Sequence, residues 1–394
     1  MSHHIRGRLV STASSSDKPP VALVGADRRI PTLDGLRGAA AIMVVLSHYF
    51  GELPHGVRGA MFGWIGVANF FVLSGFLIGK LILDRQHHEN FFAVFYVRRF
   101  CRIIPPYVLT LFLVTALFGL LPKAWTDSSG QFPLWSYLTF LQGFFMITTQ
   151  TIGAHWLAPT WTLAVEEHFY LLAPAAIVFT PRRYLVPALI VTALAAVVFR
   201  AAIYYGGMGN EMMALALLPG RADVIVCGLL AAIAIKTPTI AWARHMTALR
   251  VAPVLALVST FLLRLIDNRL FEVFGPLVVA VGCTTLLLCL VLGAPEAKRF
   301  NARMLRFCGD NAYCIYLTHL PVLGLMHGLI LGTRPDLVTP AQWLVTLAAL
   351  PVCVLVGWGM TSLVEAPLTK YGRTWAWSEA ERRSGWVSGQ RLGA

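Results

Sequence analysis

Long apolar segments alternate with short polar segments along most of the chain. A helix that crosses a bilayer needs about 20 apolar residues, with a range of about 17–25. Each segment that meets this requirement is predicted as a transmembrane helix: 33–50, 59–82, 104–122, 160–180, 184–204, 211–235, 250–267, 272–293, 311–332 and 341–364. The pattern therefore predicts an all-α membrane protein, a bundle of about ten transmembrane helices.

A further apolar segment, 134–150, is predicted to lie at the membrane surface. It reads LWSYLTFLQGFFMITTQ, and its Trp135 and Tyr137 are residue types that gather at the boundary between lipid and water. One more crossing here would also invert every later loop, which would destroy the charge asymmetry described next.

Lysines and arginines predict the orientation of the bundle, because basic loops stay in the cytoplasm. Of 32 such residues, 24 fall on the side of the N-terminus and six on the other, with Arg37 and Arg221 inside spans left out. An even number of crossings then predicts that both termini are cytoplasmic.

The composition agrees with a membrane location. The chain is 57% hydrophobic and 13% charged, whereas soluble domains are about 25% charged. The net charge of +13 is therefore explained by the basic residues that orient the bundle in the membrane. No nucleic-acid partner is expected. The lipid bilayer of the inner or plasma membrane is the expected surrounding.

We predict a disordered basic cytoplasmic tail without a signal peptide at 1–30, a membrane domain at 31–370 and a cytoplasmic tail at 371–394. The seven cysteines have no metal-ligand spacing. No disulfide framework, metal site or bound cofactor is expected.

Ionisable residues inside membrane spans are expensive and are functional candidates by default. In this chain they are Arg37, His48, Glu166, Glu167, His168, Arg221, Asp223, His319 and Glu365. Arg221 and Asp223 are candidates for acceptor contacts or for structural polar contacts. The same alternatives hold for Tyr316 and His319, which form a stripe with Tyr313 at a spacing of three residues.

The first span carries Arg37 near its cytoplasmic end and His48 further up. Their separation of 11 residues places both on nearly the same helix face, about 16 Å apart. The pantetheine arm of coenzyme A is of similar length, so phosphates bound at Arg37 would place a thioester near His48. An arginine that flanks a span and a histidine that is hydrogen-bonded in the bundle explain the pair equally well.

The segment FYVRRFCRIIPPY is predicted as a cytoplasmic loop before the third span, with Arg98, Arg99 and Arg102 as a guanidinium cluster. Arginine binds phosphate through two parallel hydrogen bonds, although basic flanking of a span would look the same. In the fourth span, Glu166 is expected at a depth where it can contact His48 and tune its pKa.

Three further expectations concern helix contacts. Glu167 is a candidate partner for Arg221. Glu365 is predicted to be structural and paired with an arginine, with Pro367 ending its helix. Gly75 and Gly79 either face a donor channel or mark close helix packing.

Seven motifs carry a family resemblance. They are LDGLRGAAAIMVVLSHYF (33–50), FFVLSGFLIGK (70–80), FYVRRFCRIIPPY (95–107), WTLAVEEHFYLLAP (161–174), RADVIVCGLLA (221–231), GDNAYCIYLTHLPV (309–322) and VEAP (364–367). In this order, from about residue 30 to 370, they resemble the acyltransferase 3 family of integral membrane O-acyltransferases.

The resemblance implies a ten-span enzyme that uses acetyl-CoA or another acyl-CoA as co-substrate. Its acceptor would be a hydroxyl of an extracytoplasmic glycan or a lipid-linked saccharide. The resemblance implies that His48 and Glu166 are catalytic residues. It also implies that Arg37, Arg99 and Arg102 bind acyl-CoA.

This chain departs from the family at two points. His168 stands where the family usually has glutamine, which bears on acceptor contacts. The C-terminal SGNH hydrolase-like domain of many relatives is not expected here.

The sequence leaves open whether His48 acts as a general base or as a nucleophile that accepts the acyl group. A small hydrophobic acceptor such as a macrolide and a non-catalytic transporter are the alternative functions.

Overall fold

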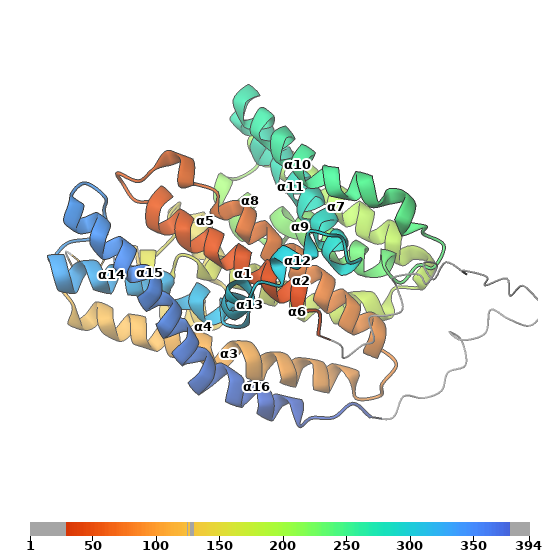
Figure 1. The fold of residues 1–394 in the computed structure, drawn as a ribbon, viewed down its shortest axis with the longest axis horizontal. Helices are drawn as coiled ribbons and strands as arrows, with labels where there is room; N and C mark the ends of the chain where they lie inside the picture. The colour runs from red at the N-terminus through yellow and green to blue at the C-terminus, as the bar shows by residue number, and fades with distance from the viewer. Residues whose placement is uncertain (1–28, 124, 127–129, 379–394) are drawn as a thin grey trace, which may run out of the picture.

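The structure is a computed structural model that describes residues 29–123, 125–126 and 130–378. These residues form helices and no strands (Figure 1). The long helices are α1 (Pro31–Leu46), α2 (Gly63–Arg85), α3 (Phe91–Leu120), α6 (Thr160–Phe179), α7 (Arg182–Tyr204), α9 (Leu218–Ala234), α10 (Trp242–Ile266), α11 (Asn268–Val291), α14 (Ala312–Leu331) and α15 (Pro340–Met360). Short helical elements connect or extend them: η1 (Ser47–Gly51), η2 (Arg58–Ala60), α4 (Leu134–Leu138), α5 (Gln142–Thr149), η3 (His155–Leu157), α8 (Glu211–Ala216), α12 (Ala297–Phe300), α13 (Arg303–Asp310), η4 (Thr361–Glu365) and α16 (Ala366–Arg373).

Within the described chain, nine helices are long and apolar enough to cross a membrane. The first predicted span is shorter as an α-helix, but the π-helical turn η1 continues it directly to Gly51. The prediction of an all-α membrane bundle is therefore confirmed. Segment 134–150 forms only the short helices α4 and α5.

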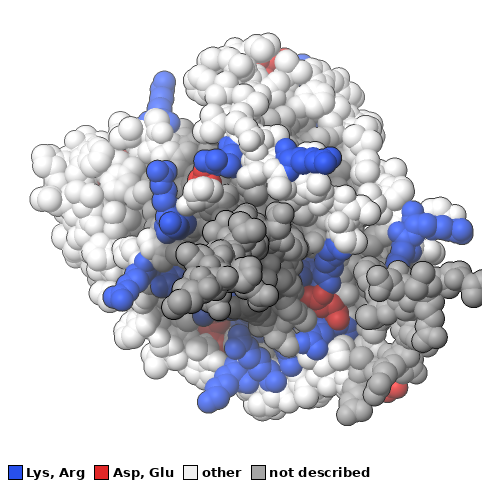
Figure 2. All heavy atoms as spheres, turned by 45° about the vertical axis from the view of Figure 1, so that its right-hand side comes forward, with Lys and Arg blue, Asp and Glu red and all other residues white. Residues whose placement is uncertain are grey.

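Both described ends of the chain lie at one end of the bundle, at the right of Figure 1. We call this the terminal end and the opposite one the far end. At the terminal end, Arg250 pairs with Glu296 at 2.5 Å, and lysines and arginines are spread over the face shown in Figure 2. At the far end, His55 pairs with Asp336 at 2.9 Å. The cytoplasmic location of the terminal end stays a prediction.

Helix α3 corrects the predicted loop before the third span. The helix begins at Phe91 and includes the whole arginine motif as well as Pro105 and Pro106. The apolar-window criterion placed the start of the span after the arginines, because charged residues end an apolar segment. The helix itself continues, since long arginine side chains can point into a polar cavity while the backbone stays hydrogen-bonded.

The last span corrects the predicted helix end at Pro367. After α15 the chain passes through the π-helical turn η4 and directly into α16, which ends at Arg373. Pro367 lies in the first turn of α16, where a missing backbone N–H is tolerated.

Helices α2 and α9 approach each other until their backbones touch. A Cβ atom on Gly75 would lie 2.0 Å from the carbonyl oxygen of Ile225, and one on Gly228 would lie 2.0 Å from that of Val72. A Cβ on Gly79 would meet the Leu229 side chain at 2.2 Å. Of the two alternatives for the α2 glycines, these contacts support close helix packing.

A buried ion pair joins α7 to α9. The Arg200 guanidinium donates to the Asp223 carboxylate at 2.9 and 2.6 Å and to the carbonyl oxygens of Gly220 and Val273 at 2.7 and 2.9 Å. Arg200 is 1% exposed and Asp223 is 0% exposed. Asp223 is therefore a structural residue. Its partner is Arg200, which the sequence places toward the outer end of the predicted span 184–204.

We predict that Gly75→Ala destabilises the protein, because the added methyl group collides with the α9 backbone. Overpacking of this kind costs about 1–3 kcal/mol. Gly119→Ala in α3 is the matched control, since a Cβ there meets nothing within 4 Å. Thermal unfolding in detergent should show a lower midpoint for Gly75→Ala alone. Equal midpoints for the two variants would contradict the packing described here.

Candidate active site

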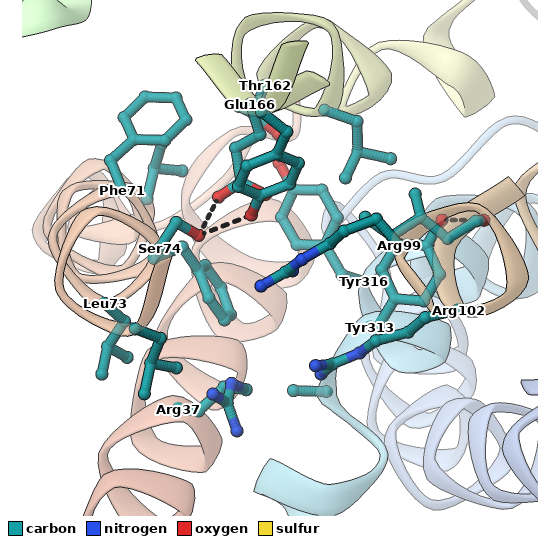
Figure 3. Close-up of a pocket in the computed structure, with 17 residues that line it drawn as sticks. Arg37, Phe71, Leu73, Ser74, Arg99, Arg102, Thr162, Glu166, Tyr313 and Tyr316 are labelled. Atoms are coloured by element: carbon teal, nitrogen blue, oxygen red, sulfur yellow. Dashed lines mark hydrogen bonds between the residues drawn. The ribbon is translucent and has the colours of Figure 1, made fainter. Parts of the chain in front are cut away.

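A cavity of about 110 Å³ lies between α1, α2, α3, α6 and α14 (Figure 3). We call it the arginine cavity, because Arg37, Arg99 and Arg102 all line it. Figure 3 shows the three guanidinium groups pointing into the same space from α1 and α3. The three residues that the sequence assigned to the donor are thus brought together by two helices.

Each arginine has a different neighbour. Arg37 donates to Asp34, one turn earlier on α1, at 3.0 Å. Arg99 lies over the Tyr170 ring at 4.7 Å, and Arg102 lies 3.6 Å from the carboxylate of Glu365. These contacts hold the side chains while leaving most of their N–H donors available, which is the arrangement expected of a phosphate site.

The opposite wall of the cavity carries a hydrogen-bonded carboxylate. Ser74 donates to Glu166 at 2.8 Å, and the Tyr170 hydroxyl lies 3.2 Å from the other Glu166 oxygen. Ser74 and Tyr170 are also 3.0 Å apart. Glu166 is therefore a cavity residue fixed by α2 and by its own helix, facing the arginines.

His48 lies in the π-helical turn η1 and contacts a second histidine. His48 Nδ1 and His319 Nε2 are 3.0 Å apart, and His319 Nδ1 is 2.7 Å from the Tyr316 carbonyl oxygen. His48 Nε2 lies 3.4 Å from Glu52, which also accepts a hydrogen bond from Ser47 at 3.0 Å. The imidazole of His319 is fully buried, whereas the His48 side chain is 18% exposed.

For two neutral imidazoles, this chain of hydrogen bonds allows one arrangement of tautomers. A backbone carbonyl only accepts, so His319 carries its proton on Nδ1 and accepts at Nε2. His48 must then donate from Nδ1, which leaves its lone pair on Nε2. The basic nitrogen of His48 therefore points toward Glu52 and not toward His319.

The expected contact between His48 and Glu166 is absent: among the described residues, neither a hydrogen bond nor an ion pair joins them. The carboxylate beside His48 is Glu52. Only its position four residues after His48 in the sequence could have indicated it.

His48 does not line the arginine cavity, although the arginines do. Two features change the straight-helix argument that placed it on the face of Arg37. The π-turn begins at Ser47, one residue before His48, and Tyr316 stands between the two places. Tyr316 lines the cavity, and its carbonyl oxygen holds His319.

The other predicted polar residues are placed as follows. Tyr316 forms a hydrogen bond with Thr162 at 2.8 Å. Arg221 lies over the Trp161 ring at 5.9 Å, outside the arginine cavity. Glu167, the partner considered for Arg221, forms no ion pair with it in the part of the chain that the structure describes.

Comparison with known proteins agrees with the motifs. Residues 30–361 match the family described as the acyltransferase domain, acyltransferase 3. Relatives include a Bacillus subtilis protein, YrhL, whose name assigns it provisionally as a peptidoglycan O-acetyltransferase. It is 26% identical over 83% of this chain and 53% of its own length.

The peptidoglycan O-acetyltransferase OatA of Listeria monocytogenes is 25% identical over 78% of this chain and 51% of its own length. The O-acetyltransferase OatA of Staphylococcus aureus is 30% identical over 40% of this chain and 26% of its own length. The chain thus spans about half the length of the first two relatives. No solved structure matches it.

Glu365 lies at the edge of the arginine cavity, near α3 and α14. Besides Arg102, it accepts from Cys314 and Thr361, both at 3.4 Å, and it is 7% exposed. We predict that Glu365→Gln lowers the free energy of unfolding by about 1 kcal/mol, the size of one weakened hydrogen-bonded contact. The thermal midpoint and the yield of folded protein should fall accordingly. Transfer activity per folded molecule should change less.

Glu296→Gln is the matched control, because Glu296 pairs with Arg250 at the exposed terminal end. A surface pair contributes about 0–1 kcal/mol, so this variant should unfold close to the wild type. Normal yield of Glu365→Gln with abolished activity would instead make Glu365 part of the reaction.

Proposed function

Because this chain belongs to the acyltransferase 3 family of integral membrane O-acyltransferases, we propose that it transfers an acyl group from acyl-coenzyme A to a glycan hydroxyl. The group is most simply acetyl, as the names of the relatives suggest. The acceptor would be an extracytoplasmic or lipid-linked saccharide. Acyl-coenzyme A would approach from the terminal end, which is the predicted cytoplasmic side.

The convergence of Arg37, Arg99 and Arg102 in one cavity is the observation that carries the proposal. Three like charges repel one another unless an anion lies between them. Coenzyme A carries its phosphate groups at the nucleotide end and its thioester at the end of the long pantetheine arm, so phosphates bound by the arginines would leave the thioester free to extend away from them. A transporter would need no such cluster at one end of a closed bundle.

His48 is the proposed catalytic residue, because its Nε2 lone pair is the basic site that the hydrogen bonds leave free. In direct transfer, Nε2 takes the proton of the acceptor hydroxyl as its oxygen attacks the thioester carbonyl. The C–O bond forms, the C–S bond breaks, and the proton passes to the departing thiolate of coenzyme A. Glu52 would stabilise the imidazolium that exists in between.

The alternative route uses His48 as the nucleophile. Nε2 would attack the thioester carbonyl, and the C–S bond would break to release the coenzyme A thiolate and leave an acyl-imidazolium. The glycan hydroxyl would then attack the acyl carbon, the C–N bond would break, and the hydroxyl proton would leave to neutralise the thiolate. Both routes need the same tautomer, so both remain open. In either route Glu166, held by Ser74 and Tyr170, would form the polar wall opposite the arginines and balance their charge.

Arginine and histidine variants should separate donor binding from chemistry. We predict that Arg102→Ala weakens coenzyme A binding and that Arg102→Lys restores it only in part, because lysine lacks the planar fork. His48→Ala should keep nearly normal affinity and lose transfer by about 10²–10⁴-fold. Calorimetric coenzyme A binding and acetyl-transfer assays on purified protein measure the two effects.

Arg183→Gln provides the control, because Arg183 lies exposed at the start of α7, over the ring of Tyr184 at 4.5 Å and outside the arginine cavity. Loss of coenzyme A affinity in His48→Ala with normal affinity in Arg102→Ala would refute this assignment. Failure of the wild-type protein to bind any acyl-coenzyme A would refute the proposed function itself.

His319 is proposed as a positioning residue that fixes the tautomer of His48. His319→Ala should lower the turnover number less than His48→Ala and leave coenzyme A binding unchanged. His319→Gln should recover part of the turnover, because an amide can donate to the Tyr316 carbonyl and accept from His48 Nδ1. If the role of His319 were purely structural, activity would fall only as far as the amount of folded protein falls. The turnover number of His319→Gln would then be no higher than that of His319→Ala.

A further inference from the structure

A second cavity, of about 280 Å³, lies at the far end of the bundle. We call it the aromatic cavity, after Trp64, Trp161 and Phe271 in its wall. These residues stand in the first turns of α2, α6 and α11, so the cavity gathers the far ends of helices that are distant in sequence. Trp64 meets Phe271 edge-on with ring centroids 5.6 Å apart.

The aromatic cavity adjoins the arginine cavity. Val67 and Phe71 of α2 line both. Phe71 also meets Trp161 edge-on, with centroids 6.4 Å apart. The two cavities are therefore separated by side chains of α2 and α6 and not by a layer of backbone.

Arg221 is the unusual group in this wall. Its neighbour Arg200 has its guanidinium satisfied by Asp223 and two carbonyl oxygens. By contrast, the guanidinium of Arg221 has no hydrogen bond or ion pair to any described residue, and its Nε atom is buried without a partner. The guanidinium lies over the Trp161 ring, at 5.9 Å, and Glu272 lines the same cavity.

An unpaired guanidinium in an apolar bundle is costly, and an acceptor or anion in the cavity would offset the cost. The charged residues in the wall are Arg221, Arg264 and Glu272, which leaves one net positive charge. Arg264 is already placed over the Phe271 ring at 5.2 Å. The wall is thus suited to an anionic group held by Arg221.

A polar groove of about 340 Å³ continues from the aromatic cavity, because Glu272 lines both. Its other polar residues are Tyr204, Asn210, Glu211, Asn268 and Arg269. Amides, carboxylates and a phenol are the groups that exchange hydrogen bonds with sugar hydroxyls. Aromatic rings beside them offer the apolar surface on which the face of a sugar ring packs.

We propose that the aromatic cavity and the polar groove bind the acceptor, an acidic saccharide whose carboxylate or phosphate is held by Arg221. This inference rests on the proposed function and specifies its acceptor side. The sugar ring lies against Trp64 and Trp161, and the neighbouring sugar occupies the polar groove. Val67 and Phe71, which line both cavities, place the bound ring directly beside the arginine cavity.

The experiment measures binding to the purified full chain with three saccharides: trigalacturonate, glucose 1-phosphate and neutral maltotriose. At least one of the anionic probes should bind about tenfold or more tightly than maltotriose, as expected for one charge-assisted contact. Which anionic probe binds decides between carboxylate and phosphate. Equal binding of all three, or binding of none, would overturn the inference.

Arg221→Gln should remove the preference for the anionic probe, while the exposed control Arg183→Gln should keep it. Arg221→Lys, which retains the charge without the fork, should keep only part of it and serves if Arg221→Gln does not fold. Persistence of the full preference in both Arg221 variants would also overturn the inference.

Coenzyme A affinity separates this result from a failure of the proposed function. Arg221 does not line the arginine cavity, so coenzyme A should bind Arg221→Gln as it binds the wild type. Wild-type protein that binds coenzyme A but shows no preference for acidic saccharides refutes the acceptor site alone. Absence of coenzyme A binding refutes the enzyme.

Discussion

The cost of holding a guanidinium group inside an apolar bundle is the constraint on which the rest of this structure depends. Arg200 offsets this cost with hydrogen bonds to the Asp223 carboxylate and to two backbone carbonyl oxygens, and it is fully buried. The arginines of the cavity offset it only in part, because within the described chain each has a single ion-pair, hydrogen-bond or aromatic-ring partner: Asp34 for Arg37, Tyr170 for Arg99 and Glu365 for Arg102. This difference in protein partners distinguishes a structural arginine from arginines that are available to bind an anionic ligand.

The packing of helix α2 decides which side chains face each cavity. Its backbone contact with α9 at Gly75 and Gly228 fixes its rotation. Ser74 then faces the arginine cavity, while Phe71 stands between the two cavities. The arginine cavity and the aromatic cavity therefore share a wall. Backbone packing sets the position of this wall, and no residue smaller than glycine is available at the contact.

The reaction centre depends on a local departure from regular helix. In the π-turn at Ser47–Gly51, the backbone N–H of Glu52 donates to the carbonyl oxygen of Ser47. The Glu52 carboxylate accepts from the Ser47 hydroxyl at 3.0 Å and lies 3.4 Å from His48. Such turns are frequent at functional sites. Tyr316 links this turn to the donor cavity, since its side chain lines the cavity and its carbonyl oxygen sets the proton on His319. A single helix, α14, thus contacts both the proposed donor cavity and the histidine pair.

The sequence by itself determined the helical class, the apolar cores of the spans and the grouping of three arginines. Length and hydropathy fix helices in a bilayer because each helix satisfies its own backbone. The motif order placed Arg37, Arg99 and Arg102 in one site, where the structure also brings them together. These features depend on residues near one another in the chain or on a pattern repeated along it.

Only the tertiary structure decided which polar residues meet. Arg200 and Asp223, His48 and His319, and Ser74 and Glu166 are each contributed by different helices. Hydropathy gives depth but not the rotation of a helix about its axis, so depth alone suggested the pairing of His48 with Glu166. Rotation is set by side-chain and glycine contacts between helices, and a π-turn shifts it further. Those contacts exist only once the bundle is packed.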